Sequence, residues 1–109
     1  MKLIFAIVHD EDSPRLMVEL NKSGYRVTKL NSSGGFLRSG NTTLMMVVED
    51  DKLKDCLDIV RKYSSSRKAA INTTITPSAI SGAYIPYPVE VTIGGATVFV
   101  VNVEYFEKM

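Results

Sequence analysis

The chain has 109 residues, of which 45% are hydrophobic and 23% are charged, so it can bury one hydrophobic core but not two. Its 13 basic and 12 acidic side chains give a formal net charge of +1, which excludes an overall field that would attract a nucleic acid polymer or an anionic membrane. One cysteine and one histidine cannot form an intramolecular disulfide or a zinc site within one chain. We therefore expect a single domain over residues 1–109 in the reducing cytoplasm, without a metal ion.

The N-terminal segment, residues 2–8, is almost entirely apolar and rich in β-branched and aromatic side chains, which predicts a central strand. The run is too short for a membrane-spanning helix or a signal peptide, and acidic residues follow it. We therefore expect neither membrane insertion nor export. His9 ends this strand beside acidic residues, and we interpret it as a surface or capping residue rather than a catalytic base.

A first helix is predicted to begin at Ser13 and Pro14. Ser13 and the acidic residues at 10–12 can accept hydrogen bonds from the free amides of the helix terminus, and proline is tolerated in a first turn. An apolar stripe follows and ends at Gly24, which suits the left-handed conformation of a helix cap.

A short glycine-rich loop, residues 31–42, follows a second predicted strand at residues 25–31. Alternation along that strand places Arg26 and Thr28 side by side on one face. Two interpretations of the loop remain open. It is either a simple turn whose phenylalanine closes the end of the core, or a site whose glycine amides, aromatic ring, positive charge and Asn41 amide bind a base and a phosphate.

A third, mostly apolar strand is predicted over residues 43–49, and Asp50 and Asp51 then cap a second helix. The apolar stripe of this helix includes Cys56, which we interpret as a core residue. Since no nucleophile in the sequence has a visible catalytic partner, we expect no enzymatic activity.

The segment after the second helix, residues 67–88, is predicted to be a long loop, because three prolines and Gly82 interrupt it. It is either a flexible loop with a few apolar residues placed on the core, or a partner surface or ligand lid.

The C-terminal part contains two alternating runs, residues 89–93 and 96–104, joined by Gly94 and Gly95. This pattern predicts a β-hairpin. The tail at residues 105–109 carries two aromatic side chains, and we expect it to dock on the body.

The order of the elements predicts an α+β fold of the ferredoxin-like split βαβ type, βαββαβ with an extra C-terminal hairpin strand. Both helices would cover one face of the sheet, and the opposite apolar face favours a homo-oligomer whose sheets face inward. Three functional classes share this architecture. An RNA-recognition module is disfavoured because the strand at 43–49 lacks aromatic and basic residues. An acylphosphatase-like enzyme is disfavoured because the acidic residues that follow the first strand would repel phosphate. The third class is a ligand-sensing trimer of the PII type.

Arg26-Val27-Thr28, the string from Ser33 to Thr43 and residues 94–100 closely resemble the PII-like cyclic-di-AMP receptor family of Gram-positive bacteria. The resemblance runs over essentially the whole chain. It implies a PII-like homotrimer that binds cyclic-di-AMP in the clefts between subunits, needs no cofactor and has no catalytic activity. The trimer would signal to a downstream protein partner, which the resemblance does not identify. The alternative is a PII-type sensor of ATP or another nucleotide or metabolite.

The resemblance also implies a role for each site residue. One phenylalanine of the loop would stack on an adenine, Asn41 would bind an adenine edge, and Arg26 with Thr28 would hold phosphate or ribose. The loop backbone would contact the nucleotide, and the last strand would line the apolar side of the pocket. Ligand contacts would order the loops at 31–42 and 67–88 and so change the surface offered to the partner. The expected ligand-binding residues are Arg26, Thr28, Gly34, Gly35, Phe36, Leu37, Asn41 and Phe99.

Overall fold

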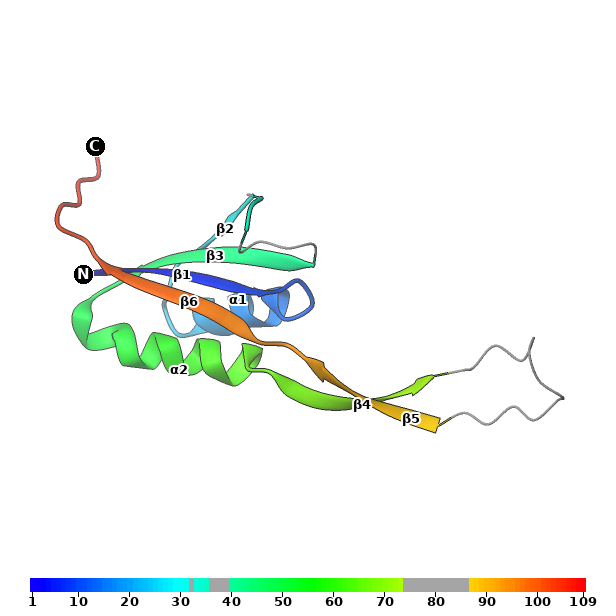
Figure 1. Cartoon of the computed structure of the whole chain (residues 1–109). Coiled ribbons are helices and arrows are strands. Elements are labelled where there is room, and N and C mark those ends of the chain that lie inside the picture. The colour runs from blue at the N-terminus through cyan, green and yellow to red at the C-terminus, as the bar shows by residue number, and fades with distance from the viewer. Residues whose placement is uncertain (32, 36–39, 74–86) are drawn as a thin grey trace, which may run out of the picture.

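A computed structural model describes residues 1–31, 33–35, 40–73 and 87–109 (Figure 1). In this part of the chain, a four-stranded antiparallel sheet is covered by two helices on one face, and a two-stranded sheet extends away from that body as an arm. The elements in chain order are β1 (Lys2–His9), α1 (Ser13–Lys22), β2 (Val27–Leu30), β3 (Asn41–Val48), the 3₁₀ turn η1 (Asp50–Lys52), α2 (Leu53–Ser64), β4 (Arg67–Thr73), β5 (Tyr87–Ile93) and β6 (Ala96–Asn102).

The strand order of the larger sheet is β2-β3-β1-β6, and each neighbouring pair is antiparallel. The helices α1 and α2 follow β1 and β3, so the arrangement is consistent with a ferredoxin-like fold and confirms the α+β prediction. The apolar segment predicted as a central strand is β1, which pairs with β3 on one side and β6 on the other.

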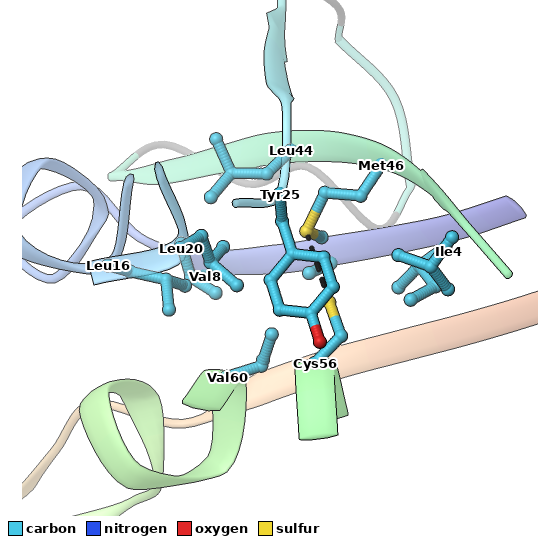
Figure 2. Packing of buried hydrophobic residues seen from close by; sticks show 11 residues of the cluster. Ile4, Val8, Leu16, Leu20, Tyr25, Leu44, Met46, Cys56 and Val60 are labelled. Atoms are coloured by element: carbon cyan, nitrogen blue, oxygen red, sulfur yellow. Dashed lines mark hydrogen bonds between the residues drawn. The ribbon is translucent and has the colours of Figure 1, made fainter. Parts of the chain in front are cut away.

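The hydrophobic core lies between the sheet and the two helices (Figure 2). Alternate residues of β1 point into it, because successive side chains of a strand face opposite sides of the sheet. Both helices contribute one apolar face, as their periodicity predicts. The largest fully buried side chains are Ile4, Leu16, Leu20, Leu44, Met46, Val8, Val60 and Cys56, with Ser64 beside them.

Cys56 and Tyr25 occupy the part of the core under α2. Cys56 is fully buried with its Sγ 3.8 Å from Sδ of Met46, which confirms its interpretation as a core residue. Burial, followed by the negative charge of Asp55, raises the pKa of the Cys56 thiol to about 11. The Tyr25 hydroxyl donates a hydrogen bond of 2.6 Å to Oδ2 of Asp55, and burial together with that acceptor raises the pKa of Tyr25 to about 12.

The helix starts differ in part from the sequence prediction. The α1 helix begins at Ser13 with Pro14 in its first turn, as expected, but the Asp12 side chain caps no described amide of the helix. Its carboxylate accepts hydrogen bonds from the Arg67 guanidinium instead. At the second helix, Asp50 and Asp51 begin the η1 turn, and Asp50 pairs with the N-terminal ammonium at 2.7 Å.

The predicted C-terminal hairpin is wrong. Strand β5 pairs with β4, whereas β6 pairs with β1 in the other sheet. Gly94 and Gly95 therefore carry the chain from one sheet to the other, and both have positive φ, 74° and 112°. A glycine pair suits a hairpin turn or a sharp bend between sheets equally well, so the pattern alone cannot distinguish the two.

The predicted loop at 67–88 is a strand at its beginning, because residues 67–73 form β4. Its last two residues belong to β5, and residues 74–86 lie outside the described residues. The tail at 105–109 was expected to dock, but Tyr105 and Phe106 are 74% and 62% exposed in the single chain.

Substitution of Gly94 by alanine is expected to destabilise the fold by roughly 1–3 kcal/mol, because its φ of +74° disfavours a side chain and space is lacking. A Cβ there would lie 2.8 Å from the Ser65 carbonyl oxygen and closer still to Nη1 of Arg67. Urea unfolding measures the loss. Gly24→Ala is the matched control, since Gly24 has φ +90° but nothing within 4 Å. Equal losses in the two variants would mean that the contacts at Gly94 do not matter.

Alkaline pH is expected to lower the free energy of unfolding. The folded pKa of Cys56 is about 11 against an ordinary 9.0, and that of Tyr25 is about 12 against 10.0. The unfolded chain therefore releases these protons at lower pH than the folded chain does. The stabilisation from both groups is fully present below pH 9.0 and is lost as pH rises from 9.0 to about 11 for Cys56 and from 10.0 to about 12 for Tyr25. Urea midpoints at pH about 8 and about 10.5 test this. In Cys56→Ala the fall should be smaller, and an unchanged fall would exclude the thiol as a cause.

Candidate functional site

The face of the larger sheet opposite the helices carries a second set of side chains, which we call the open face. Directly paired residues of antiparallel strands point to the same face, so one row across the sheet runs Thr28, Met45, Phe5, Phe99. Neither helix lies over this side (Figure 1). The open face consists of Leu3, Phe5, Ile7 and His9 of β1, Thr28 and Leu30 of β2, Asn41, Thr43, Met45 and Val47 of β3, and Thr97, Phe99 and Val101 of β6.

Three of the predicted binding residues lie on the open face. Thr28 is in β2, Asn41 is the first residue of β3, and Phe99 is in β6. Arg26 is exposed and lies immediately before β2, which begins two residues later than predicted. The prediction that Arg26 shares a face with Thr28 therefore stays a prediction.

The glycine-rich loop is described in part. Gly34 and Gly35 are exposed, and a Cβ built on either would meet no atom of the described residues within 4 Å, so these residues leave a ligand room to approach the backbone. Phe36 and Leu37 lie outside the described residues. Gly40, with φ +91°, turns the chain into β3 at Asn41.

Hydrogen bonds fix the end of this loop to the turn after β1. The amide of Asp10 donates to the carbonyl oxygen of Gly40 at 2.8 Å, and the Thr42 hydroxyl donates to Oδ1 of Asp10. His9 lies directly opposite Asn41 in the pairing of β1 with β3. Sequence reasoning placed His9 on the surface or at a cap and missed this proximity to Asn41. Only the register of β1 on β3 could have revealed it.

One chain does not bring all of these residues together. Thr28 and Phe99 occupy opposite edges of the sheet, with β3 and β1 between them. At the usual strand spacing, their backbones are separated by roughly 14 Å. Phe99 lies beside Phe5, and it is 42% exposed. The single chain therefore carries a polar part at one edge and an aromatic part at the other.

Hollows elsewhere on the described surface involve other residues. A groove of about 560 Å³ lies between α2 and β6, on the helix side of the sheet, and two smaller hollows lie near the ends of the helices. No candidate binding residue lines any of these three.

The described residues offer little for other chemistry. Among them, no group of three or more His, Cys, Asp and Glu side chains could hold a metal ion. The described thiol, Cys56, is buried and its raised pKa keeps it protonated near neutral pH, so it is a poor nucleophile. No helix in the described part of the chain has both the length and the apolarity needed to cross a membrane.

A four-stranded antiparallel sheet of ferredoxin-like topology, with both helices on one face, defines a small domain of the α+β class. The model of the cyclic-di-AMP receptor family matches residues 1–109, so the chain belongs to this family of receptors of the PII-like signalling type. This match confirms the resemblance found in the sequence.

A solved structure supports the fold. A functionally unknown protein from Pediococcus pentosaceus ATCC 25745 is 38% identical to this chain and superposes with a TM-score of 0.75. The match covers 99% of this chain and 96% of that one. The two proteins therefore share their architecture from end to end.

Proposed function

We propose that this protein is a cytoplasmic signal-transduction receptor that binds cyclic-di-AMP in clefts between the subunits of a homotrimer. The observation that carries the proposal is the separation of Thr28, on the β2 edge of the open face, from Phe99, on its β6 edge. A ligand site assembled from Thr28 and Asn41 of one subunit and Phe99 of the next would use both edges.

The chemistry of these residues suits a purine dinucleotide. An asparagine amide can bind the edge of adenine in two places, and an aromatic ring stacks on any base. The net charge of +1 provides no general attraction for phosphates, so a local cation such as Arg26 would hold them. The resemblance to the family implies that further residues complete the site. They are the Phe36 ring and the backbone of Gly34, Gly35 and Leu37.

The apolar side chains of the open face support assembly. Val47, Phe99 and Val101 are 41%, 42% and 46% exposed in the single chain. Contiguous apolar surface of this kind is unusual on a monomer and usually marks an interaction site, which another copy of the chain would cover here. A closed ring of three copies, with the β6 edge of each beside the β2 edge of the next, would bury the open faces and repeat the same site three times.

Signalling would use the segments around the site rather than catalysis. Ligand contacts would order the loop at 31–42, and the region at 67–88, which includes β4, would change the surface that it offers to a protein partner. The β4–β5 arm already extends away from the body, where a partner could reach it (Figure 1).

Calorimetry of the purified chain with cyclic-di-AMP is expected to show about one ligand per chain, with cyclic-di-GMP, ATP and AMP binding far more weakly. Asn41→Ala should weaken cyclic-di-AMP binding roughly tenfold to a hundredfold, because one adenine contact is lost. Lys54→Ala, an exposed change on α2, should leave affinity unchanged. Binding of ATP in preference to cyclic-di-AMP would favour a PII-type metabolite sensor instead.

Mixing two defective variants is expected to restore binding. Asn41→Ala removes the polar part of the site and Phe99→Ala the aromatic part, and each alone should bind weakly. In trimers mixed by unfolding and refolding together, some clefts combine the intact Asn41 edge of one chain with the intact Phe99 edge of another. Calorimetry should then recover a fraction of sites with wild-type affinity. If no such sites return, the two residues act within one chain or not at all.

A further inference from the structure

The root of the β4–β5 arm is tied to the body at two places. The chain enters the arm between the end of α2 at Ser64 and the start of β4 at Arg67, and it returns through Gly94 and Gly95. The Gly95 amide donates to the carbonyl oxygen of Ser64 at 2.6 Å, which joins the two crossings to each other. Side-chain contacts then determine how the arm leaves the body.

One ion pair spans the root. Nη2 of Arg67 lies 2.7 Å from Oδ1 of Asp12, and Nη1 lies 3.4 Å from Oδ2, so the guanidinium binds both oxygens of the carboxylate. Nη1 also donates to the Ser65 carbonyl oxygen at 3.1 Å. Asp12 is buried, and a buried carboxylate depends on its partner. A two-pronged contact of this kind holds orientation as well as distance.

Among the ion pairs of the described residues, the pair of Asp12 with Arg67 is the one that joins the arm to the body, and we call it the tether. The other described pair that involves the arm, Lys68 with Glu90 at 3.6 Å, joins β4 to β5 and lies wholly within it. Breaking Asp12 from Arg67 would therefore loosen the attachment of the arm, whereas breaking Lys68 from Glu90 would loosen the arm itself.

The carboxylate of Asp12 belongs to the same short turn that holds the ligand loop. Asp10 accepts from the Thr42 hydroxyl and donates its amide to Gly40, next to Asn41. Two residues later, Asp12 donates its amide to the carbonyl oxygen of His9 at 3.0 Å and binds Arg67 through its side chain. Residues 10–12 thus contact the end of the candidate site on one side and the root of the arm on the other.

We propose that Asp12 is a positioning residue that couples occupancy of the nucleotide site at Gly40 and Asn41 to the orientation of the β4–β5 arm through Arg67. This inference rests on the proposed function. Ligand contacts at Asn41 shift the equilibrium between two conformations of the turn at residues 10–12. Because the tether joins this turn to Arg67, each conformation gives the arm a different orientation. Asp12 touches no ligand in this scheme, and it acts through Arg67.

Hydrogen exchange of the β4 and β5 amides, with and without cyclic-di-AMP, tests the coupling. In the wild type, ligand should change their exchange rates about 5- to 150-fold, the usual range of coupling between sites. The double variant Asp12→Asn with Arg67→Gln removes both charges and the two-pronged contact without leaving an unpaired buried charge, and it should reduce the change to less than about twofold. Thr42→Val, which cuts the connection on the loop side, should do the same. Calorimetry should show cyclic-di-AMP affinity within a few-fold of the wild type in both the double variant and Thr42→Val.

Two controls separate coupling from general loosening. Glu90→Gln breaks the pair within the arm and should preserve the response to ligand. Arg67→Lys keeps the positive charge but not the two-pronged contact with Asp12, and it should retain part of the response. The inference is overturned if the wild type binds ligand without a response in the arm, or if the double variant and Thr42→Val respond as the wild type does. A wild type that does not bind cyclic-di-AMP in the calorimeter overturns the proposed function itself, and the inference with it.

Discussion

The central strand β1 is apolar on both of its faces, and the rest of the structure depends on this constraint. Ile4, Ala6 and Val8 are fully buried beneath the helices, while Phe5 and Ile7 point to the open face. Burying a large apolar side chain contributes about 1.5–3 kcal/mol relative to leaving it exposed. The helices cover the apolar side chains of one face of β1 only. Burying those of the other face favours a second layer, which copies of the same chain would supply.

This requirement also explains where the candidate site lies. If the open faces meet, the sheet edges would become subunit boundaries, and both the β2 edge at Thr28 and the β6 edge at Phe99 would lie on such boundaries. Assembly and ligand binding would then use adjacent parts of one surface. In the proposed receptor, the output would be the change in conformation that the ligand selects.

The turn at residues 10–12 shows how a short segment can serve several elements. It ends β1, begins α1, holds the start of β3 through Asp10 and the root of the arm through Asp12. Two of the acidic side chains that disfavoured a phosphate-binding loop at this position, Asp10 and Asp12, have the partners Thr42 and Arg67 here. Their negative charge thus serves the internal connections of the fold.

Local patterns in the sequence determined β1, both helices and the burial of Cys56, because periodicity depends only on neighbouring residues. The motif from Ser33 to Thr43 likewise identified the family. Tertiary structure alone decided that β5 pairs with β4, that His9 lies opposite Asn41 and that Asp12 holds Arg67 rather than capping a helix. Pairing of distant segments depends on competition among many possible partners, and the folded arrangement of the whole chain resolves that competition.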